Sequence, residues 1–153
     1  MFFGKRTSLP NQCSPQPDII SCGMPSMKDM EKAASDGIKT VINLCSPSDT
    51  PAYELSRLKE LGIRYANIPV TGPQDLTREK ALALGEIIND CGQHPVLIHC
   101  MSGNRVGALM AMKAFHADGA TPAAALDYGL KSGLGMLRGE VERLLREGAA
   151  ARG

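Results

Sequence analysis

The sequence has little net charge and no long apolar run. Its 153 residues include 17 Lys and Arg against 16 Asp and Glu, which gives a formal net charge of +1. This balance creates no broad field that would attract nucleic acid or a membrane surface. No stretch approaches the roughly 18 apolar residues of a membrane-spanning helix. We therefore expect neither a nucleic-acid partner nor a membrane partner.

The start of the chain lacks the apolar segment of a secretion signal. Residues 1–12 read MFFGKRTSLPNQ, so two aromatic residues are followed by charged, polar and proline residues. The cysteines are odd in number and follow no framework spacing: Cys13, Cys22, Cys45, Cys91 and Cys100. Without a secretion signal, such cysteines are expected to be reduced thiols. The sequence predicts a cytoplasmic location and leaves the oligomeric state open.

The length and composition predict one domain. A chain of 153 residues with 43% hydrophobic residues can bury one good core. Residues 1–17 contain three prolines among mostly polar residues and are interpreted as a loose N-terminal arm. Residues 18–150 are expected to form the domain.

Short apolar strands alternate with helical segments along the first two-thirds of the domain. Strands are predicted over residues 38–44, 63–70 and 95–100, and helices over 27–35, 51–61, 78–90, 106–117, 123–131 and 137–147. This alternation predicts an α/β fold with a mostly parallel sheet flanked by helices. In such folds, ligands bind beyond the carboxyl ends of the strands.

Residues 95–107, PVLIHCMSGNRVG, place a cysteine at that end of the most apolar strand. A helix N-terminus and a nearby cation favour the reactive thiolate form of Cys100, and free backbone N–H groups of a turn bind anions. Gly103 lets the loop turn inward, and the planar guanidinium of Arg105 can hold two phosphate oxygens. The pattern therefore indicates a nucleophile, Cys100, inside an anion-binding loop.

Five further residues are predicted to shape the substrate site. His99 precedes the nucleophile, where its ring is expected to bond nearby backbone and fix the loop. The loop itself supplies Met101, Ser102, Gly103 and Asn104. The alternative interpretation, a buried cysteine that ends a strand before a tight turn, needs no function, but the combination with Arg105 and a following helix favours the site.

From about Asp18 to Val106 the sequence resembles the dual-specificity branch of the protein tyrosine phosphatase superfamily. The small bacterial beta-lactamase hydrolase-like protein, phosphatase-like family is the most similar group. The matching segments are IKTVINL, LGIRYANIPV and PVLIHCMSGNRVGALM, together with the late segment AALDYGLKSGL. The resemblance implies a cysteine-phosphatase fold, with Cys100 as the nucleophile and Arg105 as the phosphate-binding residue.

Two features depart from the superfamily pattern. Four residues separate Cys100 from Arg105, where the best-known members have five, so the loop is one residue tighter. Val106 stands where typical members have a hydroxyl that eases departure of the thiolate. The small bacterial family accepts the shorter loop.

A phosphatase also needs a general acid for the leaving oxygen. The family places an aspartate after the strand that corresponds to residues 63–70, and Asp75 lies in the following segment TGPQDLT. Asp75 could instead only cap the helix that follows Thr77. Asp49 and Glu54 are weaker candidates for the acid.

Two other functions stay open. A sulfurtransferase of the rhodanese type uses a six-residue loop to carry a persulfide, the length of residues 100–105. Rhodaneses need a further strand after the active-site helix, however, whereas residues 106–150 look helical. A non-catalytic module that binds a phosphorylated partner is the third possibility, which intact Cys100 and Arg105 disfavour.

No metal or organic cofactor is expected. Cys91, His94, His99 and Cys100 lie close in sequence, but their spacing matches no familiar zinc pattern. The expected partner is a phosphorylated protein or a small phosphate ester. Residues 101–104 contain no Lys or Arg, so a singly phosphorylated substrate is favoured over inositol polyphosphates, although Lys28 or Lys131 could approach the pocket.

Overall fold

The computed structural model describes residues 9–152 and contains a five-stranded sheet of order β1-β2-β5-β3-β4. The strands are β1 (Cys13–Gln16), β2 (Ile19–Cys22), β3 (Thr40–Asn43), β4 (Arg64–Asn67) and β5 (Val96–His99). β1 runs antiparallel to β2, and the other three pairings are parallel. The predicted α/β fold with a mostly parallel sheet is confirmed.

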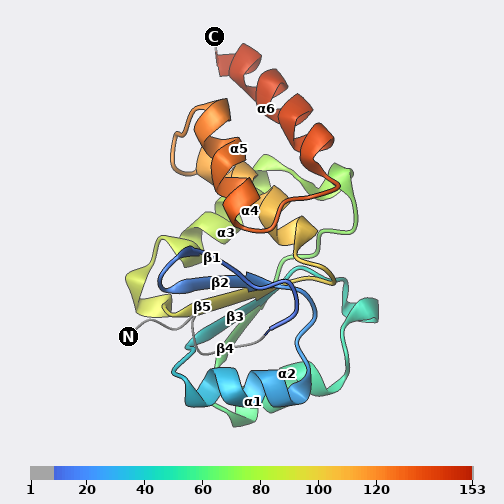
Figure 1. The fold of residues 1–153 in the computed structure, drawn as a ribbon, viewed down its shortest axis with the longest axis vertical. Coiled ribbons are helices and arrows are strands. Elements are labelled where there is room, and N and C mark those ends of the chain that lie inside the picture. Colours follow the sequence, from blue (N-terminus) through green and yellow to red (C-terminus); the bar gives the residue numbers. More distant parts are fainter. Residues whose placement is uncertain (1–8, 153) are drawn as a thin grey trace.

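Six α-helices cover the two faces of the sheet. They are α1 (Met27–Ser35), α2 (Tyr53–Glu60), α3 (Arg78–Ile88), α4 (Asn104–His116), α5 (Pro122–Lys131) and α6 (Arg138–Arg152). Helices α1 and α2 cover one face, and α3 to α6 gather on the other (Figure 1). Within residues 9–152, no helix is both long and apolar enough to cross a membrane.

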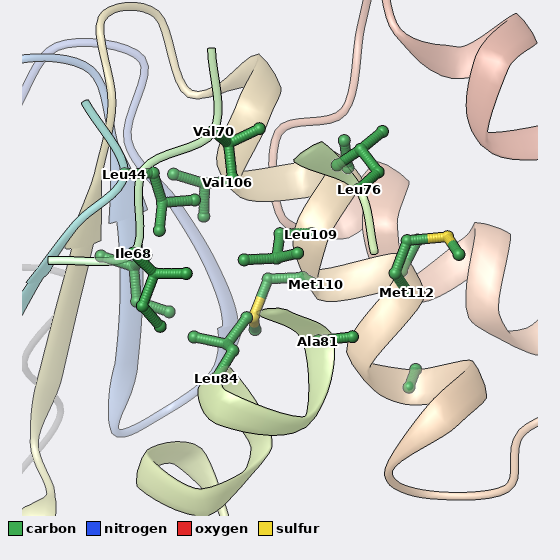
Figure 2. Packing of buried hydrophobic residues seen from close by; sticks show 14 of the residues in the cluster. Leu44, Ile68, Val70, Leu76, Ala81, Leu84, Val106, Leu109, Met110 and Met112 are labelled. Atoms are coloured by element: carbon green, nitrogen blue, oxygen red, sulfur yellow. The ribbon is translucent and has the colours of Figure 1, made fainter. Parts of the chain in front are cut away.

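The sheet separates two hydrophobic clusters because successive strand residues point to opposite faces. In β5, Ile98 belongs to the cluster under α3 to α6, whereas Leu97 belongs to the cluster under α1 and α2. Figure 2 shows the larger cluster, in which Leu109 and Met110 of α4 lie close to Leu84 of α3. The long helix α4 is therefore the centre of this layer.

The predicted helix starts are confirmed where a side chain caps the helix. The Ser26 hydroxyl accepts a hydrogen bond from the Asp29 amide at 3.1 Å, and the Asp29 carboxylate accepts one from the Ser26 amide at 2.9 Å. This reciprocal pair satisfies backbone donors that the first turn of α1 leaves free. Thr77 caps α3 in a similar way through the Lys80 amide.

The segment after β3 differs from the prediction. We expected a helix from Pro51, but α2 begins at Tyr53 and a 3-10 turn, η2 (Pro47–Asp49), precedes it. The Thr50 hydroxyl accepts a hydrogen bond from Asn43 Nδ2 at 2.8 Å and donates one to the Ser46 carbonyl at 2.8 Å. These bonds hold residue 50 in a loop, so the helix starts later.

The predicted loose arm over residues 1–17 is wrong for its second half, while residues 1–8 lie outside the described residues. Cys13–Gln16 form the edge strand β1, and Leu9 is buried in the smaller cluster. Asn11 also donates from Nδ2 to the Ser102 carbonyl at 2.9 Å. The polar sequence CSPQ hid this strand, because an edge strand tolerates proline and faces solvent. β2 was missed as well, because Ile19 and Ile20 are followed by Ser21, so its apolar run is shorter than those of the predicted strands.

Close backbone contact joins α4 to the end of α5. A Cβ atom on Gly107 would lie 2.0 Å from the Leu134 nitrogen and 2.8 Å from the Gly129 carbonyl oxygen. Both obstacles are backbone atoms, which cannot rotate away. Glycine at position 107 thus sets how closely the turn after α5 approaches the start of α4.

We expect Gly107→Ala to lower the free energy of unfolding by about 3 kcal/mol, because the added methyl group overpacks this contact. Gly139→Ala is the matched control, since a Cβ there meets nothing within 4 Å and residue 139 is also helical. The control should raise stability by about 0.5–1 kcal/mol. Urea denaturation measures both, and equal effects of the two substitutions would contradict this packing.

Candidate active site

The ends of three neighbouring parallel strands bring three cysteines together. Cys22 ends β2, Cys100 directly follows β5, and Cys45 lies just beyond β3. The Cys100 amide donates to the Cys22 carbonyl at 3.3 Å, which continues the pairing of β2 with β5. Cys100 is fully buried. The thiol therefore lies at the carboxyl edge of the sheet, where an α/β fold places its ligand site.

The loop after Cys100 turns back toward the cysteine sulfur. Gly103 adopts φ 91°, a left-handed conformation that favours glycine, and its amide donates to Cys100 Sγ at 3.1 Å. Helix α4 starts at the next residue. Among residues 9–152, no acceptor is found for the amides of Met101, Ser102, Asn104 and Arg105. These free donors at a helix start form a cradle for an anion.

Arg105 supplies a positive charge that no carboxylate neutralises within the described part of the chain. Its Nη1 atom donates to the Val70 carbonyl at 3.1 Å, which leaves most of its N–H donors free for a ligand. Val70 lies beyond β4, so the bond connects the loop of residues 100–105 to the segment that carries Asp75. The roles of Cys100 as nucleophile and Arg105 as phosphate-binding residue stay predictions.

The two cysteines beside Cys100 are poor nucleophiles at neutral pH. Burial, with a smaller contribution from the nearby Cys100, raises the pKa of the Cys45 thiol to about 11, although the positive charge of Arg105 acts in the opposite direction. Burial, with a smaller contribution from Cys100, raises the pKa of Cys22 still more strongly. Since the thiolate is the reactive form, both cysteines remain protonated neighbours.

His99 forms a buried pair with Glu54 rather than the backbone hydrogen bond that we expected. His99 Nε2 lies 2.8 Å from Glu54 Oε2, and both side chains are fully buried. The other ring nitrogen and the other carboxylate oxygen have no partner among the described residues. Both side chains are shielded from solvent, so His99 supports the end of β5 from inside the protein.

The Glu54 contact was missed in the sequence, although a signal for it existed. Glu54 and Leu58 are the buried residues of α2 and lie one turn apart. A carboxylate on the apolar face of a helix needs a buried partner. His99 is that partner, which leaves Glu54 badly placed to serve as a general acid.

Asp75 ends the 3-10 turn η3 (Pro73–Asp75), and its carboxylate is held as an acceptor. It accepts hydrogen bonds from the Thr71 amide at 2.9 Å and the Thr71 hydroxyl at 2.8 Å, and Lys80 Nζ lies 3.3 Å away. The Thr71 bonds, with a smaller effect from Lys80, hold the pKa of Asp75 below its ordinary value. Asp49, the other candidate, is exposed on η2.

The remaining loop residues have different surroundings. Met101 is 51% exposed, and the Ser102 carbonyl accepts the bond from Asn11. The Asn104 Oδ1 atom accepts from the Gly135 amide at 2.9 Å and the Leu137 amide at 3.1 Å. Asn104 therefore anchors the turn between α5 and α6 beside the loop, a role that the sequence did not reveal.

The turn anchored by Asn104 carries a side chain that is open to solvent. Met136 lies between the two bonded residues and is 94% exposed.

Within residues 9–152, no group of three His, Cys, Asp or Glu side chains is placed to hold a metal ion.

Comparison with known proteins supports the fold. No family model matches the sequence. Over 106 residues, 66% of its length, the chain is 26% identical to inositol diphosphatase DSP5 of Arabidopsis thaliana, and it spans about half (52%) of that relative.

Solved structures cover nearly the whole chain. The core catalytic domain of the PP-IP phosphatase Siw14 from S. cerevisiae is 19% identical, with a TM-score of 0.71 and coverage of 95% of this chain and 92% of the other. A phosphatase from Shewanella putrefaciens is 22% identical, with a TM-score of 0.71 and 95% coverage of both chains. The chain thus has the fold of the dual-specificity and protein tyrosine phosphatase-like enzymes, as its sequence resemblance implied.

Proposed function

We propose that the protein is a cysteine-dependent phosphatase that hydrolyses phosphate monoesters through a phosphocysteine intermediate. The observation that carries the proposal is the hydrogen bond from the Gly103 amide to Cys100 Sγ, which is 3.1 Å long. It lies at the start of a loop in which, among residues 9–152, several amides have no acceptor. This bond fixes the sulfur at the start of the loop, whose free amides can bind phosphate oxygens. Relatives of the same fold are named as phosphatases.

In the first step, the Cys100 thiolate attacks phosphorus, and the bond between phosphorus and the ester oxygen breaks. The leaving oxygen takes a proton and departs as an alcohol or phenol. The free amides of the loop and Arg105 hold the three other phosphoryl oxygens, whose charge is redistributed in the transition state. Water then attacks phosphorus, which releases inorganic phosphate and the thiolate.

The leaving-group proton is assigned to Asp75. Its segment is connected to the loop through the bond from Arg105 to Val70, whereas Glu54 is buried against His99. To donate a proton, Asp75 must first give up its present bonds with Thr71 and Lys80. We propose that it does so when substrate occupies the loop.

The surroundings of the loop favour a substrate with one phosphate and an apolar organic part. Met101 is half exposed on the loop, Met136 is 94% exposed on the turn beside it, and residues 101–104 contain no cation. Methionine side chains adapt to varied apolar groups. An aryl phosphate such as phosphotyrosine fits this rim better than an inositol polyphosphate, although DSP5 and Siw14 are named for inositol and PP-IP substrates.

The function is tested by turnover of p-nitrophenyl phosphate, run beside transfer of sulfur from thiosulfate to cyanide. We expect wild-type protein to release phosphate and Cys100→Ser to lose this activity. Cys91→Ser is the control, because Cys91 is exposed and lies in the 3-10 turn before β5, at the opposite end of that strand from Cys100. Sulfur transfer without phosphatase activity would contradict the proposal and support the sulfurtransferase alternative. The substrate class is tested by comparing the turnover of inositol hexakisphosphate with that of a phosphotyrosine peptide. A preference for the hexakisphosphate would overturn the proposed preference for a singly phosphorylated aryl substrate.

The acid role of Asp75 predicts a loss that depends on the leaving group. Asp75→Asn should slow hydrolysis of alkyl phosphates by about 10²- to 10⁴-fold, and it should affect p-nitrophenyl phosphate much less because p-nitrophenolate needs no proton. An acid works only when protonated, and the pKa of Asp75 is lowered. The wild-type rate with alkyl phosphates should therefore rise as pH falls below neutrality, and the substitution should remove this rise.

The control for this prediction is Asp49→Asn, which changes an exposed carboxylate on η2. It should leave both rates near wild type. Equal losses of Asp75→Asn with both classes of substrate would show that Asp75 only supports its loop.

A further inference from the structure

A hollow of about 370 Å³ lies between the C-terminal ends of α4 and α6 and the first residue of α3. Its lining consists of Arg78, Phe115, His116, Gly148, Ala151 and Arg152. Two of these residues are arginines and one is histidine, whereas none is acidic. No residue of the catalytic loop, 100–105, belongs to the lining. The hollow is therefore a separate, positively charged feature of the molecule.

Arg152 is fixed in this hollow without losing its charge. Its Nη2 atom donates to the Phe115 carbonyl and its Nη1 atom donates to the Ala120 carbonyl at 3.5 Å. The guanidinium carbon lies 3.5 Å from the centroid of the Phe115 ring, in a cation–π contact. Carbonyls and an aromatic face orient the group, but unlike a carboxylate they do not neutralise it.

Arg78 is exposed at the start of α3 and, within residues 9–152, has no ion-pair or hydrogen-bond partner. Glu147 directly precedes Gly148 in sequence but does not line the hollow. Its Oε2 atom lies 2.9 Å from Nη1 of Arg143. Like charges close together repel each other unless an anion lies between them. Within residues 9–152, Arg78 and Arg152 are thus two cations that line one small cavity without a carboxylate partner.

The base of the hollow is rigid. A Cβ atom on Gly148 would lie 2.7 Å from Cε2 of Phe115, so α6 rests directly on this ring. His116 meets the ring edge-on, with centroids 4.9 Å apart. Burial lowers the pKa of His116, and the charges of Arg78 and Arg152 lower it further, so the imidazole is neutral at pH 7 and offers one N–H donor.

We propose that this hollow binds a phosphate monoester dianion, as a second phosphate site apart from Cys100. Two guanidinium groups match the oxygens of a doubly charged phosphate better than a singly charged carboxylate, and the imidazole supplies a further donor. A hollow of about 370 Å³ is larger than a phosphate group needs, so an organic substituent fits beside it. The inference stands on these residues alone and does not require the proposed phosphatase activity.

The test is a titration of the full-length, ¹⁵N-labelled protein with inorganic phosphate at constant ionic strength, followed by NMR. The amides of Gly148 and Ala151 report on the hollow, and the amide of Gly103 reports on the catalytic loop. We expect saturable shifts at both places. Arg78→Ala should weaken binding at the hollow about tenfold, the effect of losing one charge-assisted contact, and leave the response of Gly103 unchanged.

The matched control is Arg146→Ala, which removes an exposed arginine from α6 that does not line the hollow. It changes the net charge equally and should leave both responses unchanged. The inference is overturned if Gly148 and Ala151 show no saturable shift, or if Arg146→Ala weakens binding there as much as Arg78→Ala does. A response of Gly103 alone would overturn the second site and still agree with the proposed phosphatase.

Discussion

The hydrogen bond from the Gly103 amide to the Cys100 sulfur is the interaction on which the proposed chemistry depends. It requires the left-handed backbone of Gly103, φ 91°, which a side chain would strain. The same turn starts α4 and, within residues 9–152, leaves several amides of the loop without an acceptor. One change in chain direction, at the carboxyl end of a buried strand, thus places the Cys100 sulfur next to the free amides of the loop.

Much of the surrounding structure holds that turn in place. On one side, Asn11 donates a hydrogen bond to the Ser102 carbonyl, so the segment before β1 helps to hold the loop. On the other side, Asn104 holds the turn before α6, and Gly107 allows Leu134 to approach α4. A loop with only four residues between its cysteine and its arginine has little freedom of its own. Contacts from both sides therefore limit its motion further.

The three cysteine thiols at this edge of the sheet have different surroundings. Cys22 and Cys45 lie at the same edge of the sheet, yet burial and the nearby Cys100 keep their pKa values high. Cys100 differs from them in the donor aimed at its sulfur. The buried contact of His99 Nε2 with Glu54 Oε2, 2.8 Å long, fixes the end of β5 next to Cys100. Within residues 100–105, Arg105 is the one cationic side chain.

The sequence predicted what depends on local pattern. Strand and helix alternation gave the parallel sheet, capping residues such as Ser26 and Thr77 marked helix starts, and residues 100–105 marked the loop. It failed where contacts join distant segments. The polar strand Cys13–Gln16 pairs with β2 and accepts a hydrogen bond from Tyr128, and Glu54 meets His99 across 45 positions of sequence. Hydrogen bonds to Asp75 from Thr71 likewise depend on a turn geometry that residue spacing does not encode.

The central claim is that phosphate becomes bonded to Cys100 during turnover, and trapping the intermediate tests it most directly. Wild-type protein mixed with an aryl phosphate would be quenched in acid within its first turnovers, digested, and analysed by mass spectrometry. The account predicts a phosphoryl group on the peptide that contains Cys100 and none on the peptides with Cys22 or Cys45. A phosphoryl group on another residue would contradict this account. So would the absence of any phosphorylated peptide together with a persulfide on Cys100 after incubation with thiosulfate.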